Sequence, residues 1–189
     1  MSQKSLTYQE AIQYLASIKD GSLPSLNGKK VRSSTKYIAG LSTGLSANNG
    51  ELVIASTVPA VGVTNFPKGN ILPKGTNWLV IGVRMLFDTT TSVTTATALW
   101  ANVAPVVWKN GELTISQKGE GILFDTSVTD VTNFKASTGN DVDFREVVPF
   151  VIREEANYSL KAQLAGTASA DQAYKLELRV IEFVDADKA

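Results

Sequence analysis

The sequence predicts a mostly β protein whose antiparallel strands pack as a sandwich or barrel, with a short helix and an extended arm before them. Two segments near the C-terminus alternate apolar and polar residues, as half-buried strands do. Further strand-like segments follow one another from residue 51 onwards, separated by Gly, Pro and Asn. None of the intervening segments has a helical period, which argues against parallel folds built from strand-helix-strand units.

The clearest alternation lies between residues 147 and 184. Two apolar rows predict the last two strands: Tyr158, Leu160, Ala162 and Leu164, then Tyr174, Leu176, Leu178 and Val180. Ile181 and Phe183 instead fall on the face of the final strand that carries its charged residues. We therefore expect a β-bulge there, or a covering contact from another subunit or from the N-terminal segment. Ile181 and Phe183 are thus candidate assembly contacts.

A short amphipathic helix is predicted near the N-terminus. Thr7 and Glu10 have the spacing of a capping box, and Gly21 is suited to end the helix. An apolar stripe runs along one side: Tyr8, Ala11, Ile12, Leu15 and Ile18. Because a lone helix of this length is marginal in water, the stripe must pack on the body, on a neighbouring subunit or at a membrane interface. Protein is favoured over membrane, and Tyr8, Ile12 and Leu15 are candidate assembly contacts.

Residues 21–50 are rich in Gly, Ser, Asn and Lys and show no sustained period, which predicts an extended arm or linker. The expected organisation is therefore a helix and arm over residues 1–50 and a β-sandwich over residues 51–189. Four bases in the arm are candidate contacts to nucleic acid: Lys29, Lys30, Arg32 and Lys36. Without interleaved aromatic residues this signal is weak, and a solvated linker is favoured.

Eight strands are expected in the body, over residues 51–58, 77–88, 97–108, 112–117, 121–125, 146–152, 157–165 and 173–184. The segment 77–88 is the most continuously apolar, as expected of a strand in the middle of a sheet. Asn110 and Gly111 separate two of these segments and predict a tight hairpin, because both residue types tolerate positive φ angles.

The bulk composition is that of a globular protein. The chain has 189 residues, 43% of them hydrophobic, and its 18 basic and 18 acidic residues cancel. Residues 1–36 carry six bases and two acids, whereas residues 114–189 carry eight bases and thirteen acids. Either the polar faces have simply drifted in composition, or the arm and the body face different surroundings or attract each other between copies. Neither a secretory leader nor an apolar run long enough to span a membrane is expected.

No catalytic chemistry is predicted. The sequence contains neither His nor Cys, which excludes Ser-His-Asp and Cys-His triads and the usual His and thiolate metal sites. We expect no enzyme activity, no cofactor and no metal site. Five aromatic residues offer an alternative, a carbohydrate-binding or lectin-like module: Trp78, Trp100, Trp108, Tyr158 and Tyr174. Core packing is the favoured role for these side chains.

The order of these features resembles the jelly-roll capsid proteins of viruses and bacteriophages. The likeness is carried by the arm 1–50, by Asn110 and Gly111, and by the closing pattern of residues 149–152, 158–164 and 174–183. It implies an antiparallel eight-stranded jelly-roll sandwich that self-assembles into a capsid shell, with copies of itself and other virion proteins as partners. It also implies a virion location, after assembly in the host cytoplasm.

The resemblance implies no active site. An arm in such a protein runs under neighbouring subunits or touches the packaged contents. Because the excess of bases in residues 1–36 is modest, an arm that links subunits is expected in preference to one that binds the genome. An ordered arm also needs a partner surface to offset the entropy lost on ordering, about 1 to 2 kcal/mol per residue.

Overall fold

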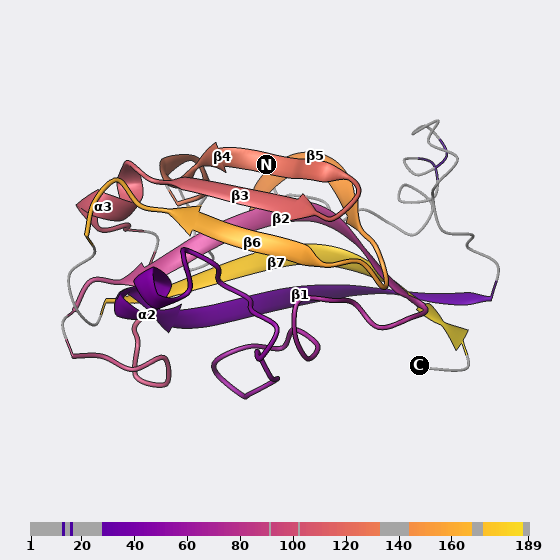
Figure 1. Cartoon of the computed structure of the whole chain (residues 1–189), viewed down its shortest axis with the longest axis horizontal. Coiled ribbons are helices and arrows are strands. Elements are labelled where there is room, and N and C mark those ends of the chain that lie inside the picture. The colour runs from indigo at the N-terminus through magenta and orange to yellow at the C-terminus, as the bar shows by residue number, and fades with distance from the viewer. Residues whose placement is uncertain are drawn as a thin grey trace, which may run out of the picture.

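A computed structural model of the chain describes residues 13, 16, 28–90, 92–101, 103–132, 144–167 and 172–186, without the side chains of residues 46, 47 and 146. It confirms a mostly β protein with two antiparallel sheets packed as a sandwich (Figure 1). The first sheet has the order β1 (Lys29–Leu41), β7 (Ala173–Asp185), β2 (Thr76–Asp88), β5 (Arg145–Ile152). The second has the order β4 (Gly121–Ser127), β3 (Glu112–Gln117), β6 (Tyr158–Gln163).

The helices in the described residues are short and lie in the connections. They are α2 (Ser42–Ala47), α3 (Val106–Lys109) and the 3-10 turn η1 (Val128–Val131). Figure 1 shows α2 and α3 at the same end of the sandwich, whereas β1 begins at the opposite end.

Strand β7 is the centre of the first sheet, because it pairs along its whole length with β1 on one side and with β2 on the other. Its even-numbered residues from Tyr174 to Val180 belong to the core between the sheets, as the sequence predicts. A shift of register between Val80 and Gly82 marks a bulge in β2, the strand beside it. β7 itself pairs with β1 without a shift of register, so the bulge expected in the final strand is not found there.

Two groups of aromatic rings fill the core. Phe66 and Trp78 have ring centroids 5.3 Å apart, and Tyr158 lies 6.3 Å from each. In the second group, Trp108 lies 5.0 Å from Phe87 and 5.3 Å from Tyr174. Trp78 and Tyr158 are on strands of different sheets, and Trp108 is on α3, just before β3, whereas Phe87 and Tyr174 are on β2 and β7. These rings therefore hold the two layers together.

The prediction of an extended arm or linker is wrong for residues 29–41. These residues form β1 and pair with β7 over thirteen positions, from Lys29 opposite Asp185 to Leu41 opposite Ala173. The helix α2 follows directly, and its Leu45 is buried in the core. The body of the protein therefore begins well before residue 51. The predicted N-terminal helix, with Tyr8, Ile12 and Leu15, lies outside the described residues apart from residues 13 and 16.

Two predicted strands are also corrected. Within 51–58, only the start pairs: Leu52 donates its amide to the Leu160 carbonyl at 2.8 Å, and Ala162 donates to the Gly50 carbonyl at 2.9 Å. Within 97–108, one bridge joins Ala101 to Phe87, and the end forms α3. The other six predicted strands correspond to β2, β3, β4, β5, β6 and β7.

The predicted hairpin at Asn110 and Gly111 is likewise wrong. Asn110 has φ of −94° and ends α3, whose first turn begins after Pro105. The tight turn joins β3 to β4 instead, where Gly119 and Gly121 take φ of 93° and 81°. Gly111 is needed for close approach, because a Cβ there would lie 2.6 Å from the Gln163 carbonyl oxygen.

Replacing Gly50 by Ala should lower the free energy of unfolding by about 2 kcal/mol. Gly50 has φ of 80°, and an added Cβ would lie 2.5 Å from the Ala162 carbonyl oxygen, at the point where residues 50–52 pair with β6. Gly62→Ala is the matched control, since φ there is 78° but nothing lies within 4 Å. Urea unfolding of both variants measures the difference; equal losses would contradict the steric explanation.

Candidate interaction surfaces

A buried ionic cluster joins three strands at the end of the sandwich where β1 begins. Glu182 of β7 is only 2% exposed. It forms ion pairs with Lys36 and with Arg32 of β1, the second at 2.5 Å. The indole Nε1 of Trp78 in β2 donates to the same carboxylate at 3.1 Å. The Lys36 ammonium also lies 5.2 Å from the centre of the Trp78 ring. The carboxylate is thus satisfied by three donors.

The charges around Glu182 decide its protonation. Burial by itself would raise the pKa of this carboxyl group, but the hydrogen bonds and charges of Lys36 and Arg32 outweigh burial. The pKa of Glu182 therefore lies below its ordinary value of 4.5. This cluster explains how a strand with so many polar residues can lie against the core.

The predicted nucleic-acid contacts lie together on β1, but three of the four pair with acids of β7. Besides Arg32 and Lys36, Lys29 lies 2.6 Å from Asp185 and donates to the Gly75 carbonyl. Lys30 is exposed. Pairing within the chain reduces the charge that these bases can offer to phosphate, and contact with nucleic acid stays a prediction.

Ile181 and Phe183 lie in what we call the outer apolar cluster, on the side of the first sheet that faces away from the second. Its members come from three strands: Leu79, Ile81, Val151, Ile181 and Phe183. All five side chains are at least nine-tenths buried, with Leu79 and Phe183 at 0% and 1% exposure. These residues form an apolar cluster separate from the core between the sheets.

The rest of that face is charged. Glu177 of β7 is buried and pairs with Arg84 and with Lys175, whose ammonium lies 2.7 Å from its carboxylate. Lys175 also lies over the rings of Tyr37, at 4.9 Å, and Trp100, at 5.8 Å. The charged residues that the sequence placed beside Ile181 and Phe183 thus form a paired network rather than a solvated row.

Four of the five aromatic residues considered for sugar binding are in the core. Trp78, Trp108 and Tyr158 have exposures of 1% or less, and Tyr174 has 6%. Burial raises the pKa of the Tyr174 hydroxyl to about 12 and raises that of Tyr158 too. Only Trp100 of the five is partly exposed. An exposed platform of several rings is therefore not formed by this set.

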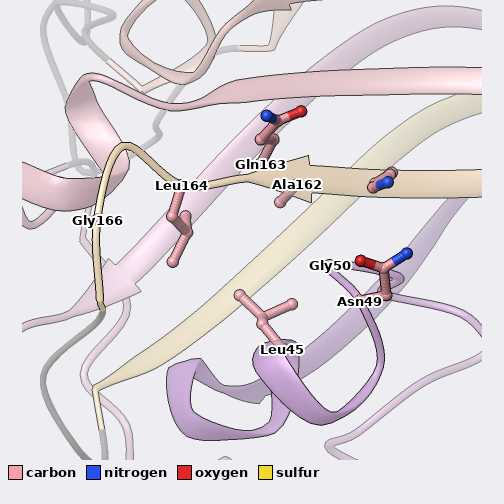
Figure 2. A pocket seen from close by; sticks show the side chains of 8 residues that line it. Leu45, Asn49, Gly50, Ala162, Gln163, Leu164 and Gly166 are labelled. Carbon is pink, nitrogen blue, oxygen red and sulfur yellow. The ribbon is translucent and has the colours of Figure 1, made fainter.

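A cavity of about 340 Å³ lies between α2 and β6, beside the short pairing of residues 50–52. Figure 2 shows the side chains of Leu45 and Leu164 pointing toward each other across it, with Asn49 and Gly50 at one side. Its lining residues are Leu45, Asn49, Gly50, Lys161, Ala162, Gln163, Leu164 and Gly166. This lining combines one cation with amides and apolar groups, and it holds no carboxylate or hydroxyl side chain to act as a base or nucleophile.

Large apolar side chains are exposed in two long connections. Val58 and Val61 lie between residue 52 and β2, with exposures of 54% and 102%. Leu99, Val103 and Val106 lie between β2 and β3, at 81%, 57% and 71%. We call these five residues the loop apolar residues. Exposed apolar side chains of this kind are available for contact with another protein.

The second of these connections is anchored to the sheet by Asp88. Its carboxylate accepts the backbone amides of Thr90 at 2.8 Å and Leu99 at 2.7 Å. These hydrogen bonds hold the pKa of Asp88 below its ordinary value. Leu99 is therefore presented on a fixed backbone at its attachment to the sheet.

The described ranges contain no cluster of three acidic, His or Cys side chains that could hold a metal ion, and none of their helices is long and apolar enough to cross a membrane. No protein-family model matches the chain, and no curated protein matches it significantly. The functional argument therefore depends on the strand arrangement and the surfaces.

Proposed function

We propose that the chain is a single jelly roll that serves as a structural subunit of a virus or bacteriophage particle. Support comes from nested strand pairing. The innermost pair is β3 with β4, the next is β2 with β5, the third is residues 50–52 with β6, and the outermost is β1 with β7. Each strand of the first half thus pairs with its counterpart in the second half, as in a jelly roll.

The proposed function is the usual role of a jelly roll that best suits the residues of this chain. Jelly rolls occur in capsid proteins, in lectins and in cupins. A cupin metal site uses His, which this sequence lacks. A sugar platform needs open rings, and Trp78, Trp108, Tyr158 and Tyr174 are buried. A shell subunit needs neither, and instead needs contact surfaces, which the loop apolar residues supply. Its partners would be copies of itself and other particle proteins.

Assembly is tested by sedimentation velocity and electron microscopy of the purified protein over a range of concentrations. We expect large, regular species that grow at the expense of monomer. A full-length protein that stays monomeric at high concentration and binds no other particle protein would contradict the proposal.

Val61→Asp and Val106→Asp should each shift assembly toward monomer, because a charge at a contact must be desolvated. Val61 and Val106 are 102% and 71% exposed, so the fold should tolerate both changes. Ser56→Asp adds the same charge at an exposed position of the first connection and is the control. Sedimentation compares the variants, and circular dichroism checks that their β content is kept. Unchanged assembly in both valine variants would exclude these loops as contacts.

A further inference from the structure

The outer apolar cluster behaves as a second, smaller core on the outside of the first sheet. Its residues alternate along their strands with residues of the main core: Leu79 follows Trp78, and Ile181 follows Val180. In a strand this alternation places successive side chains on opposite faces. The cluster therefore lies on the face away from the second sheet, where β3, β4 and β6 cannot cover it.

Among the described residues, one further hydrophobic side chain packs on the cluster, Val31 of β1. Val31 pairs opposite Phe183, so it lies in the same sheet, beside the cluster. Leu79 and Phe183 are nonetheless almost completely buried, as expected where an apolar element lies across this face.

The chain reaches this face from its N-terminal side. The continuously described residues begin at Gly28, three residues before Val31. Val31 itself packs against the cluster. The residues before β1 are therefore attached at the edge of the outer apolar cluster.

The sequence predicts a matching apolar surface on the preceding segment. Its stripe includes Tyr8, Ile12 and Leu15. Gln13, which helical geometry places on the side away from this stripe, is helical and exposed, as is Ala16. From Ile18 to Gly28 the chain can span about 33 Å, enough to return over its own sheet.

We propose that the helix around residues 8–18 docks its apolar stripe on the outer apolar cluster of its own chain. This docking does not depend on the proposed particle role. The proposal assigns the burial of Ile181 and Phe183 to the N-terminal segment and not to a contact between copies. The loop apolar residues then stay available as contact surfaces for partners.

The test uses the absence of native cysteine. Val151→Cys places a single thiol in the outer apolar cluster, where Val151 is 9% exposed. Its rate of reaction with a maleimide is measured in the full-length chain, alone and combined with Leu15→Asp or with Gln13→Asp. A thiol introduced by Val80→Cys, in the core between the sheets, reports on unfolding of the whole protein.

The expected result is slow labelling of the V151C thiol, accelerated at least about tenfold by L15D and unchanged by Q13D. Labelling of the V80C thiol should stay slow in all backgrounds. Equal V151C labelling in L15D and Q13D would overturn the proposal. So would protection that is lost on dilution of the otherwise unaltered protein, because a helix supplied by a second copy dissociates and one of the same chain does not.

Discussion

Replacing Glu182 by Gln is expected to lower the free energy of unfolding by about 3 kcal/mol, because it removes one partner of a buried ion pair. The Lys36 side chain is 11% exposed and loses its counter-charge, while Arg32, at 65%, can turn to water. Chemical denaturation at neutral pH measures the loss. Glu120→Gln is the control, since Glu120 is 38% exposed in its pair with Arg153 and should contribute less than about 1 kcal/mol.

The same substitution predicts a pH dependence. Because the pKa of Glu182 is lower in the folded chain than its ordinary value of 4.5, the unfolded state takes up this proton first as the pH falls. The stability due to the cluster is therefore complete above pH 4.5 and is lost as the pH falls through the folded pKa. The difference between the unaltered chain and E182Q should shrink below pH 4.5. A difference that stays constant to lower pH would show that Glu182 acts only through packing.

Replacing Trp108 by Ala is expected to cost about 4 kcal/mol, the second large effect. Trp108 is fully buried, touches the rings of Phe87 and Tyr174, and donates its indole nitrogen to the Ser42 hydroxyl at 3.1 Å. Its loss would leave a cavity between the sheets and remove one of the two hydrogen bonds of the Ser42 hydroxyl, which keeps its bond to the Gln172 carbonyl. Thermal unfolding should show a fall in Tm of about 10 °C.

Trp100→Ala is the matched control for that experiment. Trp100 is only partly buried, and its described ring contact is with the Lys175 ammonium. Its removal should cost less than about 1 kcal/mol. If the two Trp variants lost similar stability, the aromatic group around Trp108 would not be the link between the layers.

Strand prediction succeeded where the two faces of a strand differ in polarity. The range 112–117 is the same in the prediction and in β3, and β7 differs from its predicted range by one residue, at its C-terminal end. β1 was missed because its inward face carries Arg32, Ser34 and Lys36, which look solvated in the sequence. This face can be buried because Glu182 pairs with its basic side chains, and Glu182 is 150 residues from Arg32. Local patterns contain no information about such a partner.

The hairpin at Asn110 and Gly111 failed for a related reason. Turn residues predict a change of direction, but not which segments it connects. Here Pro105 starts a helical turn that buries Trp108, and Gly111 makes the close approach to β6. Burial of a large ring outweighed the local preference for a two-residue turn.

The candidate contacts were partly predictable. The unusual position of Ile181 and Phe183 on a charged face was visible in the alternation, and the structure groups both with Leu79, Ile81 and Val151. The loop apolar residues were not predicted, because single exposed valines in connections resemble ordinary strand residues. Only their exposure in the folded chain distinguishes them.

The central position of β7 in the first sheet determines the order in which the strands of that sheet can pair during folding. Since β1 bonds only to β7 among the described strands, it has no sheet to join until the ribosome has made the chain some 150 residues further on. The hairpin of β3 and β4, by contrast, can close early. We therefore expect slow, late consolidation of the first sheet, with the edges of β1 and β2 open meanwhile to strands of other nascent chains. A chain released before β7 would lack the strand that joins β1 to β2.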